Sequence, residues 1–238
     1  MSDFFRFPHT QHLFWLGHDT PRNDKVLTQT EVAAMLLGDV VVEEKLDGAN
    51  VGFSLSLDGG LRVQNRGQYL TAMHAGQFLR LPEWMAQHSE GLYAALKPNL
   101  VLFGEWCAAR HSLDYDALSD WFFLFDVYDR IAGRFWSSPR RNALACMSGL
   151  VTVPQVLQGK VTVSTLTQLV VTVPSHFRQG ALEGVVIRRE STDWCDARAK
   201  LVRPDFAQTI DTHWRTRSIE WNRLDYAIGA QSEPNGMN

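Results

Sequence analysis

The stretch Glu43-Glu44-Lys45-Leu46-Asp47-Gly48-Ala49-Asn50 places a single lysine directly after the apolar β-branched run Val40–Val42. The sequence contains no other lysine or arginine between Lys25 and Arg62. A lysine ammonium at the end of a buried strand is costly unless its pKa falls or it finds partners. The stretch therefore admits two interpretations: a nucleophilic lysine, or a hairpin lysine at the sheet surface with Asp47-Gly48 as its turn.

The composition is that of an ordinary globular protein, with 45% hydrophobic and 21% charged residues. The 238 residues suffice for one large domain or two small ones, and either could bury a full core. No apolar run in the sequence approaches the roughly 20 residues that a membrane-spanning helix needs. The N-terminus also lacks the basic and then apolar order of a secretory signal. We therefore expect a cytoplasmic protein without a membrane anchor.

The cysteine and histidine patterns argue against a metal centre built from these residues. The three cysteines, Cys107, Cys146 and Cys195, are odd in number and form no CxxC pair, which is typical of a reducing compartment. The eight histidines show no metal-ligand spacing, and we interpret them as structural or surface groups. A structural zinc site is therefore not expected.

The net charge of −3 means that the chain as a whole does not attract polyanions. Only five of the 23 basic residues are lysines. The arginine guanidinium binds phosphate groups through two parallel hydrogen bonds, which lysine cannot do. A high genomic GC content would produce the same excess of arginine over lysine. Any contact with nucleic acid would therefore use a local patch.

The hydrophobic pattern predicts strands and short helices in one domain without a clear internal boundary. Residues 1–25 are irregular and rich in aromatic side chains, which suits either a substrate-facing segment or an arm that packs on the core. Strands are expected at 40–42, 51–57, 61–66, 100–103, 121–128, 151–157, 182–188 and 199–202. Helices are expected at 30–37, 74–96 with an interruption near Pro82, 137–147, 165–171 and 206–215.

Four of the expected strands begin or end with a charged residue that an ordinary core would not require. These residues are Lys45, Glu105, Glu183 and Lys200, and each lies beside a glycine or an apolar run. A glycine there lets the backbone approach a ligand closely. One such residue is usually a surface group. Two carboxylates together with two lysines suit the binding of a nucleotide phosphate and a divalent metal while an amine attacks that phosphate.

That chemistry requires each of these residue types. A lysine amine is nucleophilic only when it is deprotonated, and its reference pKa is about 10.4. A neighbouring cation such as Lys200, together with a bound metal, would lower that pKa and neutralise a triphosphate. Magnesium prefers oxygen ligands, which Glu105 and Glu183 could supply directly or through water. Phe125 could stack on a purine ring.

Five short segments of the chain resemble, in order, the five motifs of the covalent nucleotidyltransferases. That superfamily contains DNA ligases, RNA ligases and mRNA capping enzymes. The segments run from residue 45 to about 200, and their order makes the resemblance far more specific than any one of them alone. They are Lys45-Leu46-Asp47-Gly48, Phe103-Gly104-Glu105-Trp106, Phe123-Leu124-Phe125-Asp126, Glu183-Gly184-Val185-Val186-Ile187 and Arg198-Ala199-Lys200.

Within this superfamily the chain resembles the short ATP-dependent RNA ligase branch. DNA ligases and capping enzymes usually carry arginine two residues after the glycine of the lysine motif, where this chain has Asn50. Arg66, in Gln64-Asn65-Arg66-Gly67, is similar to the motif arginine of the RNA ligase branch. The chain also ends 32 residues after Phe206, which we expect to be too short for an oligonucleotide-binding barrel.

The resemblance implies an α+β fold of the nucleotidyltransferase, ATP-grasp-like type. Mainly antiparallel sheets with flanking helices would hold the nucleotide in the cleft between the sheets. We expect residues 1–238 to form a single adenylyltransferase domain, the catalytic domain of a ligase, without an oligonucleotide-binding barrel. Residues 207–238 would form a short helical C-terminal extension.

The resemblance also implies roles for individual positions. Lys45 would form the lysyl–AMP bond, and Lys200 would bind the α-phosphate and assist the leaving group. Glu105 and Glu183 would contact the ribose and hold Mg²⁺ or Mn²⁺, partly through water. The other positions expected at the nucleotide are Glu44, Asp47, Gly48, Asn50, Arg66, Phe125, Asp126 and Arg198.

Several of these remaining positions carry a more specific expectation. Glu44 would lie beside the adenine through its backbone, Phe125 would stack on the ring, and Asp126 would brace the site. Asp47, Asn50 and Arg66 would contact ribose or phosphate, or order metal-bound water. Arg198 departs from the branch, which generally has a second lysine there, so its geometry is expected to differ.

These implications predict an ATP-dependent RNA ligase that joins 5′-phosphate and 3′-hydroxyl ends through lysyl–AMP. Its partners would be ATP and RNA ends, including nicked duplexes, together with an end-healing kinase or phosphatase, and the ligase itself would be a monomer. The alternatives are a DNA nick ligase, a GTP-dependent capping enzyme, and a non-catalytic module that binds nucleotide or RNA ends. The cluster His213-Trp214-Arg215 could stack on a base or hold a 5′-phosphate, or it could belong to an amphipathic helix.

Overall fold

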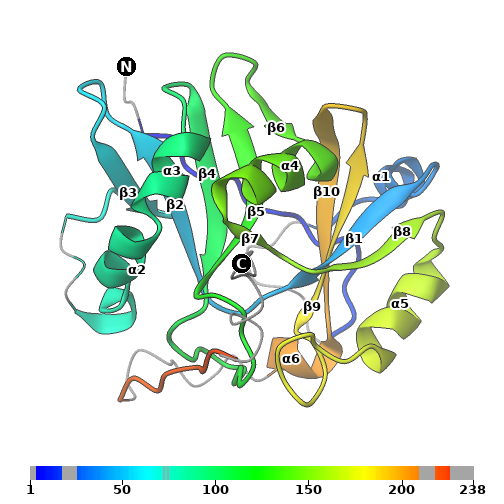
Figure 1. The fold of residues 1–238 in the computed structure, drawn as a ribbon. Helices are drawn as coiled ribbons and strands as arrows, with labels where there is room; N and C mark the ends of the chain where they lie inside the picture. The colour runs from blue at the N-terminus through cyan, green and yellow to red at the C-terminus, as the bar shows by residue number, and fades with distance from the viewer. Residues whose placement is uncertain (1–3, 18–25, 72, 74, 209–217, 226–238) are drawn as a thin grey trace, which may run out of the picture.

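One ten-stranded sheet organises the molecule in the computed structural model, which describes residues 4–17, 26–71, 73, 75–208 and 218–225 (Figure 1). The strand order is β3-β2-β4-β5-β6-β10-β9-β1-β8, and β7 pairs with β5 in parallel. The other strand pairs are antiparallel. The strands are β1 Val40–Lys45, β2 Ala49–Leu55, β3 Leu61–Asn65, β4 Leu100–Trp106, β5 Phe122–Asp129, β6 Arg134–Trp136, β7 Val151–Thr152, β8 Gln155–Gly159, β9 Gly184–Glu190 and β10 Trp194–Val202.

The sheet has two limbs, and each buries its own hydrophobic core against helices. The first limb, β3-β2-β4-β5-β6, packs residues such as Phe53 and Leu102 against α2, α3 and α4. The second limb, β10-β9-β1-β8, packs Val42 and Val185 against α1 and α5. The helices are α1 Gln29–Met35, η1 Gly76–Phe78, α2 Leu81–Gln87, α3 Ser89–Ala95, α4 Ser138–Ser148, α5 Val163–Thr172 and α6 Pro204–Gln208.

The two limbs meet at only a few points. Between β6 and β10, the pairs Trp136↔Trp194 and Phe135↔Cys195 join the sheet. The chain crosses from β1 to β2 through Leu46–Gly48, directly after Lys45. A β-carbon at Gly48 would lie 2.4 Å from the carbonyl oxygen of Trp106, so this crossover passes against β4 where a side chain would not fit. The crossover therefore holds Lys45 at the junction of the limbs.

Buried charges tie the limbs together beneath this junction. Arg141 on α4 donates to Glu43 on β1 at 2.6 Å, and Arg188 on β9 donates to Asp126 on β5 at 2.7 Å. All four side chains are buried. Arg141 also donates to the backbone carbonyl of Phe125 at 2.6 Å, so helix, β1 and β5 share one guanidinium. A buried ion without a partner is strongly unfavourable, and the pairs therefore hold the limbs in one arrangement.

The fold class predicted from the sequence is confirmed, with one difference in detail. The structure is a mixed fold with a mainly antiparallel sheet and flanking helices, as expected. The two sheets expected on either side of the cleft are instead two limbs of one sheet, because β6 pairs with β10. Among the described residues, the helices are all too short or too polar to cross a membrane.

Several predicted elements have different bounds in the structure, and one strand was not predicted. The strand expected at 151–157 is divided into β7 and β8 around Pro154, which lacks the N–H that a central strand position would donate. Pro82 lies in the first turn of α2 and therefore begins a helix within 74–96 instead of interrupting one. The last strand is longer than expected, because β10 begins at Trp194, and β6 was not predicted.

The C-terminal region differs from the prediction of a helical extension. The expected helix at 206–215 corresponds to α6, Pro204–Gln208, and the rest of it lies outside the described residues. The cluster His213-Trp214-Arg215 is among those undescribed residues. Residues 218–225 are extended and pair with the loop before β5 through the bridges Ala109↔Trp221 and Leu118↔Leu224. Their backbone groups find partners in that loop, so this segment needs no helix to satisfy them.

Replacing Arg141 with methionine should test the buried charge network. The variant keeps much of the side-chain volume but leaves Glu43 buried without its 2.6 Å partner, so the free energy of unfolding should fall by about 3–5 kcal/mol. Urea denaturation followed by circular dichroism measures the change.

The matched control is Arg134→Met, which breaks the exposed pair of Arg134 with Asp196. This variant should lose no more than about 1 kcal/mol. Equal losses in the two variants would contradict a special role for the buried network.

Candidate active site

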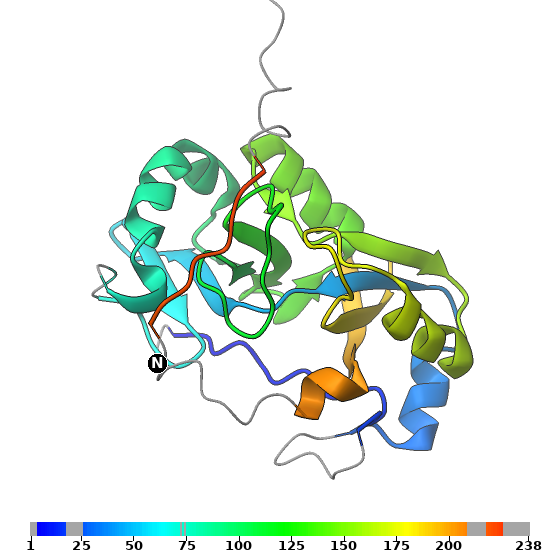
Figure 2. The same ribbon diagram turned by 90° about the horizontal axis from the view of Figure 1, so that it is seen from below.

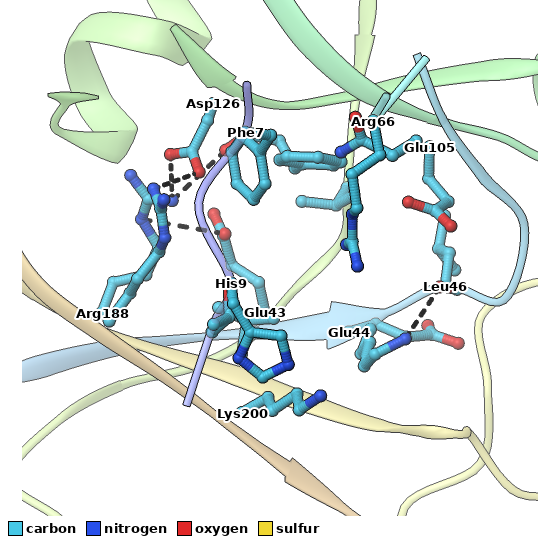
Figure 3. A pocket seen from close by; sticks show the side chains of 17 residues that line it. Phe7, His9, Glu43, Glu44, Leu46, Arg66, Glu105, Asp126, Arg188 and Lys200 are labelled. Carbon is cyan, nitrogen blue, oxygen red and sulfur yellow. Dashed lines mark hydrogen bonds and ion pairs between the residues drawn. The ribbon is translucent and has the colours of Figure 1, made fainter. Parts of the chain in front are cut away.

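A pocket lies where the two limbs meet, and it gathers side chains from distant parts of the chain (Figure 3). Figure 3 shows Arg66 from the first limb and Lys200 from the second projecting into this common space. Of the positions singled out in the sequence, those that line the pocket are Glu44, Lys45, Asn50, Arg66, Glu105, Phe125, Asp126, Arg198 and Lys200. Glu183 and Gly48 lie beside it and are hydrogen-bonded to the pocket residues Lys45 and Glu105, and Asp47 lies in the crossover that follows Lys45.

Lys45 forms an ion pair with Glu183, with 2.6 Å between its Nζ and the carboxylate Oε2. The register of β1 against β9 places Lys45 opposite Gly184, which brings the preceding residue, Glu183, to the amine. The Lys45 side chain is 26% exposed, whereas that of Glu183 is 6% exposed. The amine is therefore reachable from the pocket while its partner is buried.

The electrostatic surroundings of Lys45 differ from the expectation. Burial favours the neutral amine, but the negative charges of Glu183, Glu105 and Asp47 outweigh it, and the pKa of Lys45 is raised above its ordinary value. The sequence reasoning predicted a lowered pKa because of Lys200 and a metal. The carboxylates nearest to the amine act in the opposite direction, and the lowering by a bound metal stays a prediction.

The two carboxylates proposed as metal ligands have raised pKa values. Burial raises the pKa of Glu183 to about 8, against the lowering effect of Lys45. Burial likewise raises the pKa of Glu105 to about 7, and its Oε1 accepts the backbone N–H of Gly48 at 3.0 Å. Two buried carboxylates near each other repel, and a divalent cation between them would remove that cost.

The oxygen donors of this site fit a hard divalent cation such as Mg²⁺ or Mn²⁺. Among the described residues, no group of three His, Cys, Asp or Glu side chains is arranged to hold a metal by itself. A cation held by Glu105 and Glu183 would therefore complete its shell with water and substrate oxygens. Asn50, opposite Glu105 in the β2–β4 register, has a buried Oδ1 without a hydrogen-bond partner in the described structure. This oxygen is available to a ligand hydroxyl or a bound water.

Asp47 is engaged with protein groups. Its Oδ2 accepts the backbone N–H groups of Ser112 and Leu113, both at 2.7 Å. Its own N–H donates to the hydroxyl of Tyr115 at 2.9 Å. Asp47 thus joins the crossover after Lys45 to the loop before β5, a contact that its spacing in the sequence did not indicate.

Glu44 is turned away from Lys45, as neighbouring residues in a strand are, and its side chain is fully buried. Its Oε2 accepts the backbone N–H of His176 at 3.0 Å and lies 2.9 Å from His176 Nδ1. Its own backbone N–H donates to the carbonyl of Pro154 at 2.9 Å. The side chain therefore fixes the loop that follows α5, and the role of the Glu44 backbone beside adenine stays a prediction.

Asp126 and Arg198 form one wall of the pocket. Asp126 lies between Arg188, at 2.7 Å, and Arg198, at 2.6 Å. The Arg198 guanidinium also lies over the rings of Phe7, at 4.5 Å, and Phe135, at 4.0 Å. A planar guanidinium can stack and pair at the same time, which a lysine ammonium cannot, and this explains how arginine is accommodated here.

An N-terminal arm, residues 4–13, contributes pocket residues that the sequence analysis did not single out. The backbone of Lys200 is paired with the arm, since its N–H donates to the Gln11 carbonyl at 2.9 Å and its carbonyl accepts from Leu13 at 2.7 Å. Figure 3 shows His9 of the arm beside Lys200, and Phe7 higher in the pocket. Phe7 is also buried in a cluster with Phe103. The described part of this segment therefore packs on the core and also lines the pocket, and its substrate-facing role stays a prediction.

Glu43 and Arg188 also line the pocket without having been predicted. Glu43 points to the same face of β1 as Lys45, because successive side chains of a strand alternate. A glutamate two residues before the lysine, within an otherwise apolar run, was the available signal. For Arg188 the signal was an arginine ending the apolar run 184–187.

The RNA ligase family model matches this chain over residues 38–202. Among solved structures, a Naegleria gruberi RNA ligase with pyrophosphate superposes with a TM-score of 0.66 at 17% identity, covering 89% of this chain and 60% of that one. A lysine-to-alanine variant of the Naegleria gruberi RNA ligase, with ATP and Mn, has a TM-score of 0.61 at 18% identity, covering 75% and 54% of the two chains. An archaeal ATP-dependent RNA ligase has a TM-score of 0.58 at 19% identity, covering 85% and 49%.

The chain thus spans between about half and three-fifths of the length of these solved ligases. A comparison with curated protein sequences found no match. At identities below one fifth, the structural likeness establishes the shared fold.

Replacing Glu183 with glutamine removes the carboxylate closest to Lys45, so the pKa of the Lys45 amine should fall. At a given pH between about 9 and 11, more of the amine is then neutral, and an amine-directed reagent should modify it faster than in the wild-type protein. Peptide mass spectrometry after timed labelling across this pH range measures the rate.

Exposed Lys97 in the same digest is the internal control, and its rate should not change. An unchanged pH profile of Lys45, or one shifted to higher pH, would show that Glu183 does not set the charge state of the amine.

Proposed function

The chain belongs to the RNA ligase family, and from that premise we propose that it is an ATP-dependent RNA ligase that works through a lysyl–AMP intermediate. The observation that carries the proposal is the position of Lys45. It is a half-buried amine at the junction of the limbs, with carboxylates on one side and the cations Arg66 and Lys200 across the pocket. That arrangement is suited to an amine that attacks a phosphate.

In the first step, Nζ of Lys45 forms a bond to the α-phosphorus of ATP while the bond to pyrophosphate breaks. The attacking amine must be neutral, so Lys45 first loses a proton. Glu183 accepts a hydrogen bond from this amine at 2.6 Å and so orients it. The Lys45 side chain is 26% exposed, so its proton can leave to solvent before the attack.

Arg66 and Lys200 would neutralise the phosphates during this step. Figure 3 shows both side chains directed into the pocket from opposite limbs. A triphosphate between them would be held from two sides, which fixes its α-phosphorus relative to Lys45. Lys200 would also stabilise the negative charge that develops on the departing pyrophosphate.

Glu105 and Glu183, with water and nucleotide oxygens, would hold Mg²⁺ or Mn²⁺. When bound, the cation neutralises phosphate charge and favours the deprotonated form of a nearby amine. The solved Naegleria gruberi ligases with ATP and Mn are of this fold, which supports the same requirement here. The buried oxygen of Asn50 is a further acceptor for a metal-bound water or a ribose hydroxyl.

The adenine would lie against Phe125, with Phe7 of the arm beside it. The two rings lie edge to face, 5.2 Å apart, and both line the pocket. The backbone carbonyl of Phe125 accepts hydrogen bonds from Arg141 at 2.6 Å and from Arg188 at 3.3 Å. These two bonds fix the backbone of the residue on which the adenine would stack. A fixed aromatic ring loses little freedom when a base stacks on it.

In the remaining steps, AMP passes to the 5′-phosphate of an RNA strand, and a 3′-hydroxyl displaces AMP to form the phosphodiester. We include in the proposal RNA ends as partners, nicked duplexes among them, and an end-healing kinase or phosphatase that prepares the ends. A monomeric enzyme in the cytoplasm completes the proposal.

Incubation with ATP labelled at the α-phosphate and Mg²⁺ should attach label to the protein, as seen on a denaturing gel. Lys45→Ala should abolish this label, because the proposal makes Lys45 the amine that bonds to the α-phosphorus. The matched control, Lys97→Ala on the exposed surface, should retain it.

Two outcomes would overturn the proposal: label that comes from GTP alone, or an adduct that persists in Lys45→Ala. The adenylylated wild-type protein, offered nicked duplexes of each RNA and DNA combination, then tests the substrate. Sealing of DNA nicks without sealing of RNA ends would identify a DNA nick ligase instead.

Chelation of divalent metals should stop formation of the adduct, and Mg²⁺ or Mn²⁺ should restore it. Glu105→Gln removes one charged ligand, so the metal concentration for half-maximal rate should rise by about tenfold or more. The rate of adduct formation as a function of free metal measures this. Glu90→Gln, an exposed glutamate on α3, is the control. The same metal dependence in all three proteins would contradict the assignment of Glu105.

A further inference from the structure

A C-terminal strap, residues 218–225, lies outside the 38–202 span that matches the family and runs beside the 107–118 loop (Figures 1 and 2). The two segments are joined along their length by backbone hydrogen bonds. Near one end, the backbone N–H of Arg110 donates to the carbonyl of Glu220 at 2.8 Å. Near the other end, the backbone N–H of Asp225 donates to the carbonyl of Leu118 at 2.8 Å. The strap is thus part of the folded domain next to the site.

Asn222 is the buried side chain by which the strap holds this loop. It is 4% exposed, and its Oδ1 accepts the backbone N–H of Tyr115 at 2.9 Å. Its Nδ2 donates to the carbonyl of Cys107 at 2.7 Å, with that of Ala109 at 3.4 Å. An asparagine amide carries an acceptor and two donors, so one side chain fixes both sides of the loop.

The opposite face of the same loop holds the crossover that follows Lys45. The hydroxyl of Tyr115 accepts the N–H of Asp47 at 2.9 Å, and the Tyr115 side chain is 2% exposed. Two further loop N–H groups donate to the Asp47 carboxylate. Tyr115 therefore contacts Asn222 with its backbone and Asp47 with its side chain.

Asn222 reaches the proposed active site by two routes, directly at Cys107 and through Tyr115 at Asp47. Cys107 is two residues after Glu105 in the chain, and Asp47 is two residues after Lys45. Glu105 and the crossover are themselves joined, since Glu105 accepts from the N–H of Gly48 at 3.0 Å. A displacement of the loop would therefore move both the carboxylate and the amine.

We propose that Asn222 is a positioning residue for Lys45, acting through Tyr115 and Asp47, and that the strap is a working part of the adenylylation site. The proposal deepens the proposed ligase function and rests on it. Asn222 touches neither nucleotide nor metal in this scheme. Its role is to keep the nucleophile in the attacking geometry, where errors of about 1 Å can cost a hundredfold in rate.

The proposal predicts a loss of rate without a loss of nucleotide affinity. In Asn222→Ala, lysyl–AMP formation at saturating ATP should slow by about tenfold or more, while the KM for ATP stays within about twofold. Tyr115→Phe, which removes one hydroxyl, should slow the same step. Because Asn222 and Tyr115 belong to the same chain of contacts, the double variant should form lysyl–AMP at about the rate of the slower single variant. Single-turnover labelling measures all rates.

The control variant on the same strap is Glu220→Gln. Glu220 pairs with Arg110 at the surface, with side chains 59% and 40% exposed, and the change should leave the rate unchanged. Thermal melting of every variant by circular dichroism shows the temperature at which each is fully folded. All rates are then compared below that temperature, which separates positioning from stability.

Multiplicative losses in the double variant, or a wild-type rate in folded Asn222→Ala, would overturn the proposal. A rise in the KM for ATP alone would also overturn it. If the wild-type protein forms no adduct, the proposed function fails first, and a second readout still tests the path. The rate of modification of Lys45 by an amine-directed reagent should change in Asn222→Ala and not in Glu220→Gln.

Discussion

The buried ion network of Glu43, Arg141, Arg188 and Asp126 is the interaction on which the rest of the structure depends. Placing a charged group in the interior costs several kcal/mol, and this cost is offset only if partners approach at hydrogen-bond distance. Here the partners come from α4, β1, β5 and β9, so the network forms only when both limbs of the sheet are in place. Few residue pairs join the strands at the junction between the limbs, so the buried ion pairs fix how the two limbs are placed.

The proposed active site uses the same junction in a second way. Glu43 and Lys45 point to one face of β1, and the first is neutralised by Arg141 while the second meets Glu183. The network pairs the charges beneath the pocket, and beside it the pKa values of Glu105, Glu183 and Lys45 are raised. A divalent metal would stabilise such a site, because its positive charge would offset the repulsion between the carboxylates.

Two segments outside the family span complete the site from its ends. The N-terminal arm pairs with Lys200 and contributes Phe7 to the pocket wall, and the C-terminal strap holds the loop that contacts Asp47. Neither segment carries a recognisable motif. Both segments act through hydrogen bonds to backbone groups. Many different sequences can make such bonds, because they require only a suitable course of the chain and one suitable side chain.

The sequence by itself determined where most strands lie, through their apolar runs, and its resemblance to the covalent nucleotidyltransferases implied the mainly antiparallel α+β fold and the importance of the charged strand ends. It did not reveal that Lys45 pairs with a residue 138 positions away, that Arg198 stacks on Phe7, or that residues 218–225 are extended. Alternation tells which face of a strand a side chain occupies, but the partner on that face depends on strand register and on how the limbs meet. The pKa of Lys45 follows from those contacts, and so only the tertiary structure could decide it.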